Sequence, residues 1–134
     1  DEGGLYASLD YLARLGPVTS LDDLQRASFV GFEDYAPYLQ ALNARGIAVT
    51  EQHIPVLTDN HLVHVQLTRQ GLGIGVMPCA MGDADPALRR VLPDLAGFRY
   101  PVWLVAHREL QTSPRVRLVW DLIAERLPGL LQGA

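Results

Sequence analysis

The chain has 134 residues, of which 49% are hydrophobic and 19% charged, and its formal net charge is −4. So high an apolar content with so small a net charge excludes a disordered chain, and no apolar run approaches the roughly 20 residues that cross a bilayer. A single cysteine, Cys79, excludes an internal disulfide framework. The cations are eleven scattered arginines. We therefore expect no nucleic-acid contact by this chain itself, because such contact needs clustered cations.

The first half of the chain alternates short helical and strand patterns. Helices are predicted over residues 7–15, from a Thr19-Ser20 cap onward, and over 35–45, each with an apolar face. Asp23, three residues after Ser20, completes a pattern that resembles a capping box. Strands are predicted over residues 27–32 and 47–57, where β-formers are frequent.

The most regular segment lies in the middle of the chain. The residues 58–60 offer N-cap oxygens to a helix that Gly71 ends. Its predicted apolar face consists of Leu62, Val63, Val65 and Leu67. A short apolar strand over residues 72–78 follows directly. This passage is typical of an α/β layer in which helices cover a largely parallel sheet.

The last third is less regular until its final helix. Residues 79–94 are predicted as a loop that contains a turn at 82–86 and an edge strand at 89–93, and residues 100–106 as a further strand. Thr112-Ser113-Pro114 opens the final helix. Its apolar stripe contains Val116, Val119, Trp120, Ile123, Ala124 and Leu127. The order of elements predicts an α/β fold with an open sheet.

Ligands of open α/β sheets bind outside the carboxyl ends of the strands. Three of the predicted strand ends carry suitable groups. The candidate binding residues are Gly31, Phe32, Leu57, Thr58, Asp59, Pro78 and Cys79. The helix that begins at Asn60 also offers backbone N–H groups to a carboxylate or a phosphate. The alternative is that Thr58, Asp59 and Asn60 only cap this helix.

Other motifs favour structural roles. The run Gly71-x-Gly73-x-Gly75 follows a helix and enters a strand, which is the opposite order from a phosphate-binding loop, so we expect helix termination and close packing there. His61 and His64 share a helix face near Asp59, but a third metal ligand would have to come from His53 or His107. We expect these histidines to face solvent, and predict no metal site and no cofactor.

Catalysis is not predicted either. Asp22 and Asp23 lie in the first turn of a helix, where acidic groups complement the helix dipole. An enzyme that uses Asp59, His61 or Cys79 would need a nucleophile, a base and an orienting group at suitable spacing, and the sequence supplies no such set.

Four motifs, in this order along the chain, resemble motifs of LysR-type transcriptional regulators. They are LYASLDYLARLG at residues 5–16, TRQGLGIGVMPC at 68–79, GDADPALRRVLP at 82–93, and PVWLVAH with SPRVR between 101 and 117. Each motif alone is weakly specific, but together they cover nearly the whole chain.

This resemblance implies an effector-binding region built like a type 2 periplasmic binding protein, with two α/β lobes and a ligand cleft between them. Residues 1–103 would form the second lobe, and residues 104–134 would return to the first lobe. The fold would be incomplete, so that the final helix lacks its usual sheet. The cleft-lining positions implied by the family fall on the strand ends chosen above.

The resemblance also implies partners. They are a small-molecule effector, for which a small organic acid is one candidate, and further copies of the chain in a dimer or tetramer. DNA would be contacted only through an N-terminal winged helix-turn-helix, which these 134 residues do not include. We expect a cytoplasmic protein with no membrane contact, and a fragment of a longer chain because no initiating Met is present. The alternative function is the solute-binding module of a transport system.

Overall fold

The computed structural model describes residues 1–108 and 112–131. Its elements are β1 (Glu2–Ser8), α1 (Leu9–Leu15), a 3-10 helix (Asp22–Arg26), β2 (Val30–Phe32), α2 (Tyr35–Asn43), a 3-10 helix (Glu51–His53), β3 (Val56–Thr58), α3 (His61–Arg69), β4 (Gly75–Pro78), α4 (Cys79–Ala84), β5 (Leu88–Arg90), β6 (Phe98–Arg99) and α5 (Pro114–Leu131). The α/β class predicted from the sequence is confirmed.

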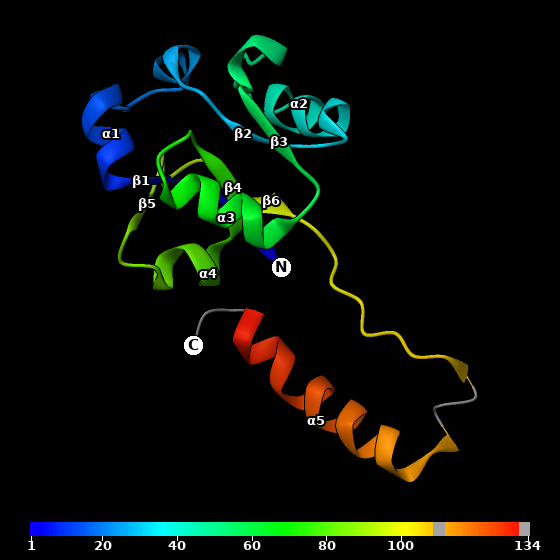
Figure 1. Cartoon of the computed structure of the whole chain (residues 1–134). Coiled ribbons are helices and arrows are strands. Elements are labelled where there is room, and N and C mark those ends of the chain that lie inside the picture. Colours follow the sequence, from blue (N-terminus) through cyan, green and yellow to red (C-terminus); the bar gives the residue numbers. More distant parts are fainter. Residues whose placement is uncertain (109–111, 132–134) are drawn as a thin grey trace.

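Two groups of strands form the sheet structure (Figure 1). In the first group β1 pairs with β4, β5 and β6, and all three pairs are antiparallel. In the second group β2 and β3 are parallel. A parallel bridge between Phe29 and Ile74 joins the groups. The predicted largely parallel sheet is therefore wrong for β1. It holds for β2, β3 and β4 because helices α2 and α3 connect these strands, as parallel neighbours require.

Strand β1 is the central strand and is buried on both faces. Its side chains alternate between two clusters, as the pleat of a strand dictates. Leu5 and Ala7 belong to the main core, whereas Tyr6 packs with Met77 and Leu88 in a second cluster.

Polar side chains fix the first helical segments. Ser8 is the last residue of β1, and its hydroxyl accepts a hydrogen bond from the Tyr11 N–H at 3.2 Å. The helix predicted over residues 7–15 therefore begins two residues later, at Leu9. The carboxylate of Asp23 accepts the backbone N–H groups of Thr19 and Ser20 at 2.9 and 3.0 Å. These hydrogen bonds, the Thr19 N–H first, lower the pKa of Asp23 to about 2.

The glycine-rich run between α3 and β4 has the structural roles that its sequence predicts. Gly71 follows α3 with a φ of 77°, a conformation that favours glycine at the end of a helix. At Gly73 an added Cβ would lie only 2.7 Å from the backbone oxygen of Ser28. The run ends a helix and lets two strands approach each other.

Three predicted segments differ from the structure. Residues 79–94 are not all loop, because α4 forms at Cys79–Ala84; the edge strand predicted at 89–93 is β5, at Leu88–Arg90. Within residues 47–57 the predicted strand is reduced to β3, after the 3-10 helix Glu51–His53. Residues 100–106, which are predicted as a strand, lie outside any strand. The sequence of this last segment suits a strand, but a strand needs a hydrogen-bonding neighbour, and no described strand pairs with it.

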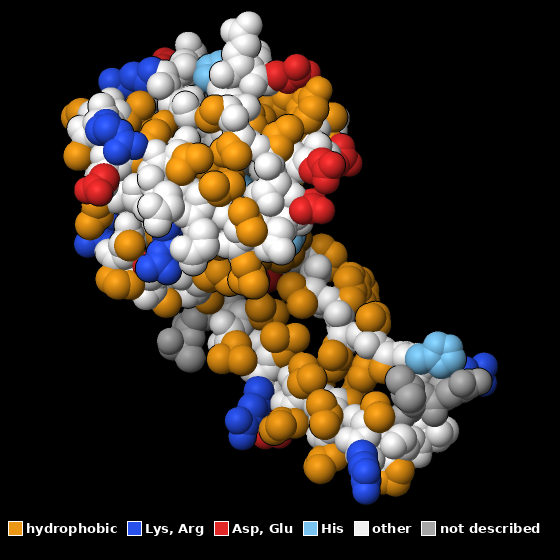
Figure 2. All heavy atoms as spheres, in the orientation of Figure 1, with side chains coloured by type: hydrophobic (Ala, Val, Ile, Leu, Met, Phe, Trp, Pro, Cys, Tyr) orange, Lys and Arg blue, Asp and Glu red, His pale blue; other side chains and the backbone are white. Residues whose placement is uncertain are grey.

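The segment before α5 extends away from the α/β body, and α5 runs back so that its last turn lies near the body (Figure 1). The predicted final helix is confirmed, but none of its residues is buried. Trp120 and Leu127 of the predicted stripe line a hollow with Val102 and Leu104. Trp103 is 77% exposed, and Figure 2 shows many hydrophobic side chains along this unit. In the described ranges no helix is both long and apolar enough to cross a membrane.

Candidate ligand-binding site

The carboxyl ends of β2, β3 and β4 share one edge of the sheet, because these strands are parallel. Gly3 of β1 pairs with Pro78 at the end of β4, so the start of β1 lies at the same edge. Two hollows open there. The first, the apolar cavity, has a volume of about 320 Å³ and is lined by Gly3, Phe32, His61, Leu62, His64, Val65, Val76, Met77, Pro78, Met81 and Tyr100.

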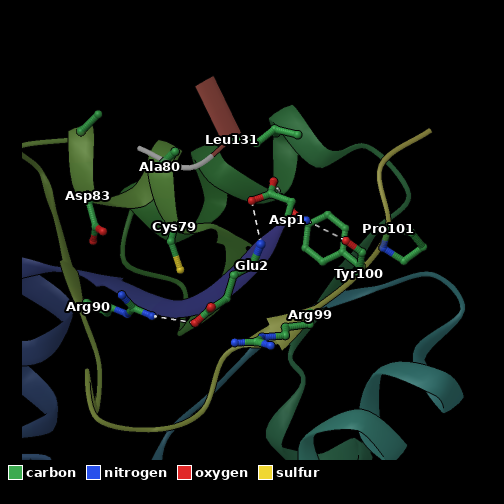
Figure 3. A pocket seen from close by; sticks show the side chains of 11 residues that line it. Asp1, Glu2, Cys79, Ala80, Asp83, Arg90, Arg99, Tyr100, Pro101 and Leu131 are labelled. Atoms are coloured by element: carbon green, nitrogen blue, oxygen red, sulfur yellow. Dashed lines mark hydrogen bonds and ion pairs between the residues drawn. The ribbon is translucent and has the colours of Figure 1, made fainter. Parts of the chain in front are cut away.

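The second hollow, the charged hollow, has a volume of about 1110 Å³ (Figure 3). It is lined by Asp1, Glu2, Cys79, Ala80, Asp83, Ala84, Arg90, Arg99, Tyr100, Pro101 and Leu131. Its charges balance one another, since Arg90 Nη2 lies 3.6 Å from Glu2 Oε1. Tyr100 is the one residue that lines both of these hollows, and its hydroxyl donates to Asp1 Oδ2 at 2.9 Å.

Phe32 forms a fixed wall of the apolar cavity. Its ring stacks on the imidazole of His64, with 4.4 Å between the ring centroids and 2° between the planes. The ring of His61 lies 5.0 Å away and is tilted. Tyr38 makes an edge contact at 5.4 Å from the core side. Three aromatic neighbours thus hold the Phe32 side chain at the carboxyl end of β2.

His64 connects α3 to β4 beside this wall. Its side chain is 1% exposed, and Nε2 accepts the Val76 N–H at 3.2 Å. Burial first, and then the charge of His61, lower the pKa of His64 to about 4; the Gly31 backbone opposes this shift. The imidazole is therefore neutral at pH 7, with its proton assigned to Nδ1 by the Val76 hydrogen bond. Within the described chain Nδ1 makes no hydrogen bond of good geometry.

The predicted apolar face of α3 is wrong for Leu62 and Val63, whereas Val65 packs against the second cluster and Leu67 is half-buried. Leu62 is 72% exposed and Val63 is 44% exposed, whereas His64 and Thr68 are buried. Each of these two polar residues has a hydrogen-bond partner: the Thr68 hydroxyl donates to the His64 carbonyl at 2.9 Å, and His64 Nε2 accepts the Val76 N–H. The expectation that both histidines face solvent is likewise wrong for His64.

The start of α3 is occupied by its own cap. The side-chain oxygen of Asn60 accepts the N–H groups of Leu62 and Val63 at 2.9 and 3.2 Å. Thr58 Oγ1 accepts the Asn60 N–H at 3.1 Å, and Asp59 is exposed. Of the two sequence-based alternatives, capping is the one seen, so an anion would have to displace Asn60 to reach these donors.

Replacement of Asn60 by alanine is expected to lower the free energy of unfolding by about 1 kcal/mol, because two N–H groups lose their acceptor. Urea denaturation of the wild-type chain, Asn60→Ala and Asn60→Asp measures this effect. The aspartate variant keeps a side-chain oxygen and should unfold near the wild-type midpoint. Equal midpoints for the alanine variant and the wild type would show that the cap contributes nothing.

The predicted binding residues do not lie together in one site. Phe32 and Pro78 come together in the apolar cavity, but Cys79 lines the charged hollow. Gly31 and Leu57 face each other in the β2–β3 pair, and the space beside Gly31 is filled by Ile54 and Leu57. Thr58 serves the start of α3, as described above.

Sequence reasoning missed most of the cavity lining. The missed residues are Gly3, His61, Leu62, His64, Val65, Val76, Met77, Met81 and Tyr100. In the sequence, His64 is a candidate metal ligand only, and His61 is a candidate metal ligand or catalytic group. Among the residues that the structure describes, no three His, Cys, Asp or Glu side chains gather into a possible metal site.

Gly82 and Asp83, which begin the motif at residues 82–93, hold α4 against Tyr6 of strand β1. The hydroxyl of Tyr6 donates to Asp83 Oδ1 at 2.7 Å, and burial together with this hydrogen bond raises the pKa of Tyr6. A Cβ on Gly82 would lie 2.4 Å from the Tyr6 ring. This contact positions Met81 and Cys79, which line the two hollows from α4.

Comparisons with known proteins agree with one another. Residues 1–128 match the family model of the LysR substrate binding domain. The regulatory domain of CrgA, a LysR-type transcriptional regulator from Neisseria meningitidis, is similar in structure with a TM-score of 0.73 at 19% identity, over 94% of this chain and 64% of that one. The regulatory domain of AphB from Vibrio vulnificus gives 0.58 at 19% identity, over 92% and 64%.

The effector domain of AmpR from Pseudomonas aeruginosa gives a TM-score of 0.56 at 16% identity, over 92% of this chain and 63% of that one. The chain therefore spans less than two thirds of each of these three domains. None of the curated proteins matches the sequence. At such identities the structural likeness establishes the fold.

Proposed function

Because the chain belongs to the LysR substrate-binding domain family, we propose that it is the effector-binding part of a LysR-type transcriptional regulator. The observation that supports a ligand-binding role is the apolar cavity at the edge where β2 and β4 end. DNA would be contacted by an N-terminal winged helix-turn-helix outside these residues, in a cytoplasmic oligomer. The comparisons give no support to a transport module, and the family is one of regulators rather than enzymes.

The proposed mechanism is a shift between conformations and involves no chemical reaction. A ligand that binds one arrangement of the lobes more tightly than another increases the population of the first. Phe32 and Pro78, which line the cavity, are the predicted effector residues that this proposal retains as direct contacts. Gly31, Leu57 and Thr58 would act by holding the strand ends in place, and Cys79 and Asp59 lie outside the cavity.

We also propose that residues 1–103 form the second lobe and that residues 104–134 return to the first. Two observations support this division. Helix α5 has no buried residue, and segment 101–107, although strand-like in sequence, has no strand partner among the described residues. The matched CrgA domain is longer than this chain, of which 94% is aligned. The other part of such a domain would cover these apolar surfaces.

The isolated chain is expected to self-associate, because α5 exposes apolar side chains that would gain from burial. Sedimentation velocity over a range of concentrations should show a rising average mass. Leu118→Asp, at a position that is 73% exposed, should reduce this association. Leu9→Asp, on the exposed side of α1, is the matched control and should leave it unchanged. A wild-type chain that stays monomeric at all concentrations would contradict this expectation.

The function itself is tested in the organism. A strain that lacks the gene should show altered amounts of a small set of transcripts, restored by the wild-type gene. A gene that carries Met81→Glu, which places a charge at the rim of the cavity, should restore them only partly and should no longer respond to the effector. Complementation with Leu9→Asp is the control. Unchanged transcripts in the deletion strain would contradict the regulatory function.

A further inference from the structure

The lining of the apolar cavity is notable for the absence of charge. None of the residues that line it is Asp, Glu or Arg. Its titratable side chains are His61, His64 and Tyr100. His64 is buried and uncharged at pH 7, and burial raises the pKa of Tyr100 so that the phenol stays protonated. Acids and arginines gather instead in the adjoining charged hollow.

An anion inside this cavity would have no arginine or lysine beside it. The N–H groups of Leu62 and Val63 at the start of α3 already donate to Asn60. Arg90, in the charged hollow, already pairs with Glu2 at 3.6 Å. A carboxylate that entered the cavity would lose its hydration and gain neither an arginine partner nor the N–H groups of Leu62 and Val63, which is a large cost.

The same walls suit a flat, uncharged ring. The Phe32 ring is held by three aromatic neighbours. Met77 and Met81 contribute thioethers, which make favourable contacts with the edges of aromatic rings. An apolar cavity of about 150 Å³ holds benzene in another protein. The volume of about 320 Å³ here has room for one or two fused rings.

We propose, on the basis of the function proposed above, that the apolar cavity binds an uncharged aromatic ring of the effector against Phe32, Met77 and Met81. Any charged group of the effector lies outside this cavity. An organic acid can bind this site only if its ring enters the cavity and its carboxylate stays outside.

Three probes test this proposal on the full chain by ¹H–¹⁵N NMR titration. Indole, an uncharged ring system, should shift the amide signals of Val65, Val76 and Met77 in a saturable manner. Benzoate, which has one carboxylate, should bind more weakly with its carboxylate outward. Terephthalate, which has a carboxylate at each end, should leave these signals unshifted at the concentration that half-saturates the chain with indole.

Variants locate the site. Met81→Glu, at a side chain that is 44% exposed, should weaken indole binding tenfold or more, and Phe32→Leu should weaken it several-fold. Leu118→Glu in α5 is the matched control and should bind indole as the wild type does. Terephthalate binding equal to indole, no saturable shift with indole, or shifts that map to α5 would each overturn the proposal.

The two proposals fail in different ways. If indole binds in the cavity but deletion of the gene changes no transcript, the regulatory function is wrong and the ring site stands. If transcripts respond to an effector that has no ring and does not shift the amides of Val65, Val76 and Met77, the ring site is wrong and the regulatory function stands.

Discussion

Gly73→Ala is expected to lower the free energy of unfolding by about 3 kcal/mol, because the new methyl group would be forced into backbone. An added Cβ would lie 2.7 Å from the oxygen of Ser28 and 2.9 Å from its carbonyl carbon. Flexible side chains can move away from such contacts, but the backbone of Ser28 is tied to Ile74, whose N–H it accepts at 2.8 Å. Overpacking at sites that cannot relax typically costs 1–3 kcal/mol and occasionally more.

Gly73 lies where the two groups of strands meet, so the loss of stability is expected to affect the whole α/β body. The Phe29–Ile74 bridge is the junction between the β2–β3 pair and the strands around β1. Separation of these strands would also disturb the edge at which the apolar cavity opens. We therefore expect Gly73→Ala to lower both the urea midpoint and the affinity for indole.

Gly129→Ala in α5 is the matched control for this substitution. Apart from its chain neighbours and the backbone of its own helix, nothing lies within 4 Å of a Cβ built at Gly129, and alanine favours a helix over glycine by about 1 kcal/mol. This variant should be as stable as the wild type or slightly more stable. If the two glycine variants have the same urea midpoint, the close approach at Gly73 is not a constraint on the fold.

The elements that the sequence predicts well are those fixed by local chemistry. The end of α3 at Gly71 and the hydrogen bonds from the N–H groups of Thr19 and Ser20 to Asp23 depend on neighbouring residues alone. The long α5 follows from its proline start and its periodic stripe. Strand β1 was missed because it is the central strand of a sheet with β4, β5 and β6, which lie far later in the chain.

The residues of the candidate site also fall into those that local rules predict and those that depend on distant contacts. The rule that ligands bind at strand ends predicted Phe32 and Pro78, since that rule needs only the order of elements. The buried position of His64 could not be read from periodicity, because a polar residue is buried only where a partner such as the Val76 N–H awaits it. Met81 was assigned to a loop, and it reaches the cavity only because α4 packs on Tyr6.

His64 is expected to make the stability of the chain depend on pH by an amount on the order of 3 kcal/mol. Its pKa is about 4 in the folded chain, compared with 6.5 for an unperturbed histidine. Between these values the unfolded chain binds more protons than the folded chain, so the free energy of unfolding rises with pH. The contribution is complete above pH 6.5 and is lost as the pH falls to about 4. Each pKa unit corresponds to roughly 1.4 kcal/mol.

This pH dependence arises because the His64 imidazole both accepts a hydrogen bond and fills a buried position. Protonation of Nε2 would remove the acceptor of the Val76 N–H and would place a charge in a buried position against Phe32. The carboxylate of Asp23 titrates near pH 2 and so contributes to acid unfolding below this window. Urea midpoints measured between pH 4 and 7.5 therefore isolate the histidine effect better than measurements in stronger acid.

Two variants separate His64 from other titrating groups. His64→Gln keeps a side-chain acceptor for the Val76 N–H but does not titrate, so its urea midpoint should vary much less between pH 4 and 6.5 than that of the wild type. His61→Gln changes the exposed neighbour and should keep most of the wild-type slope, because burial is the larger cause of the shift at His64. If the wild type and His64→Gln lose stability in parallel as the pH falls, the buried imidazole is not the group responsible.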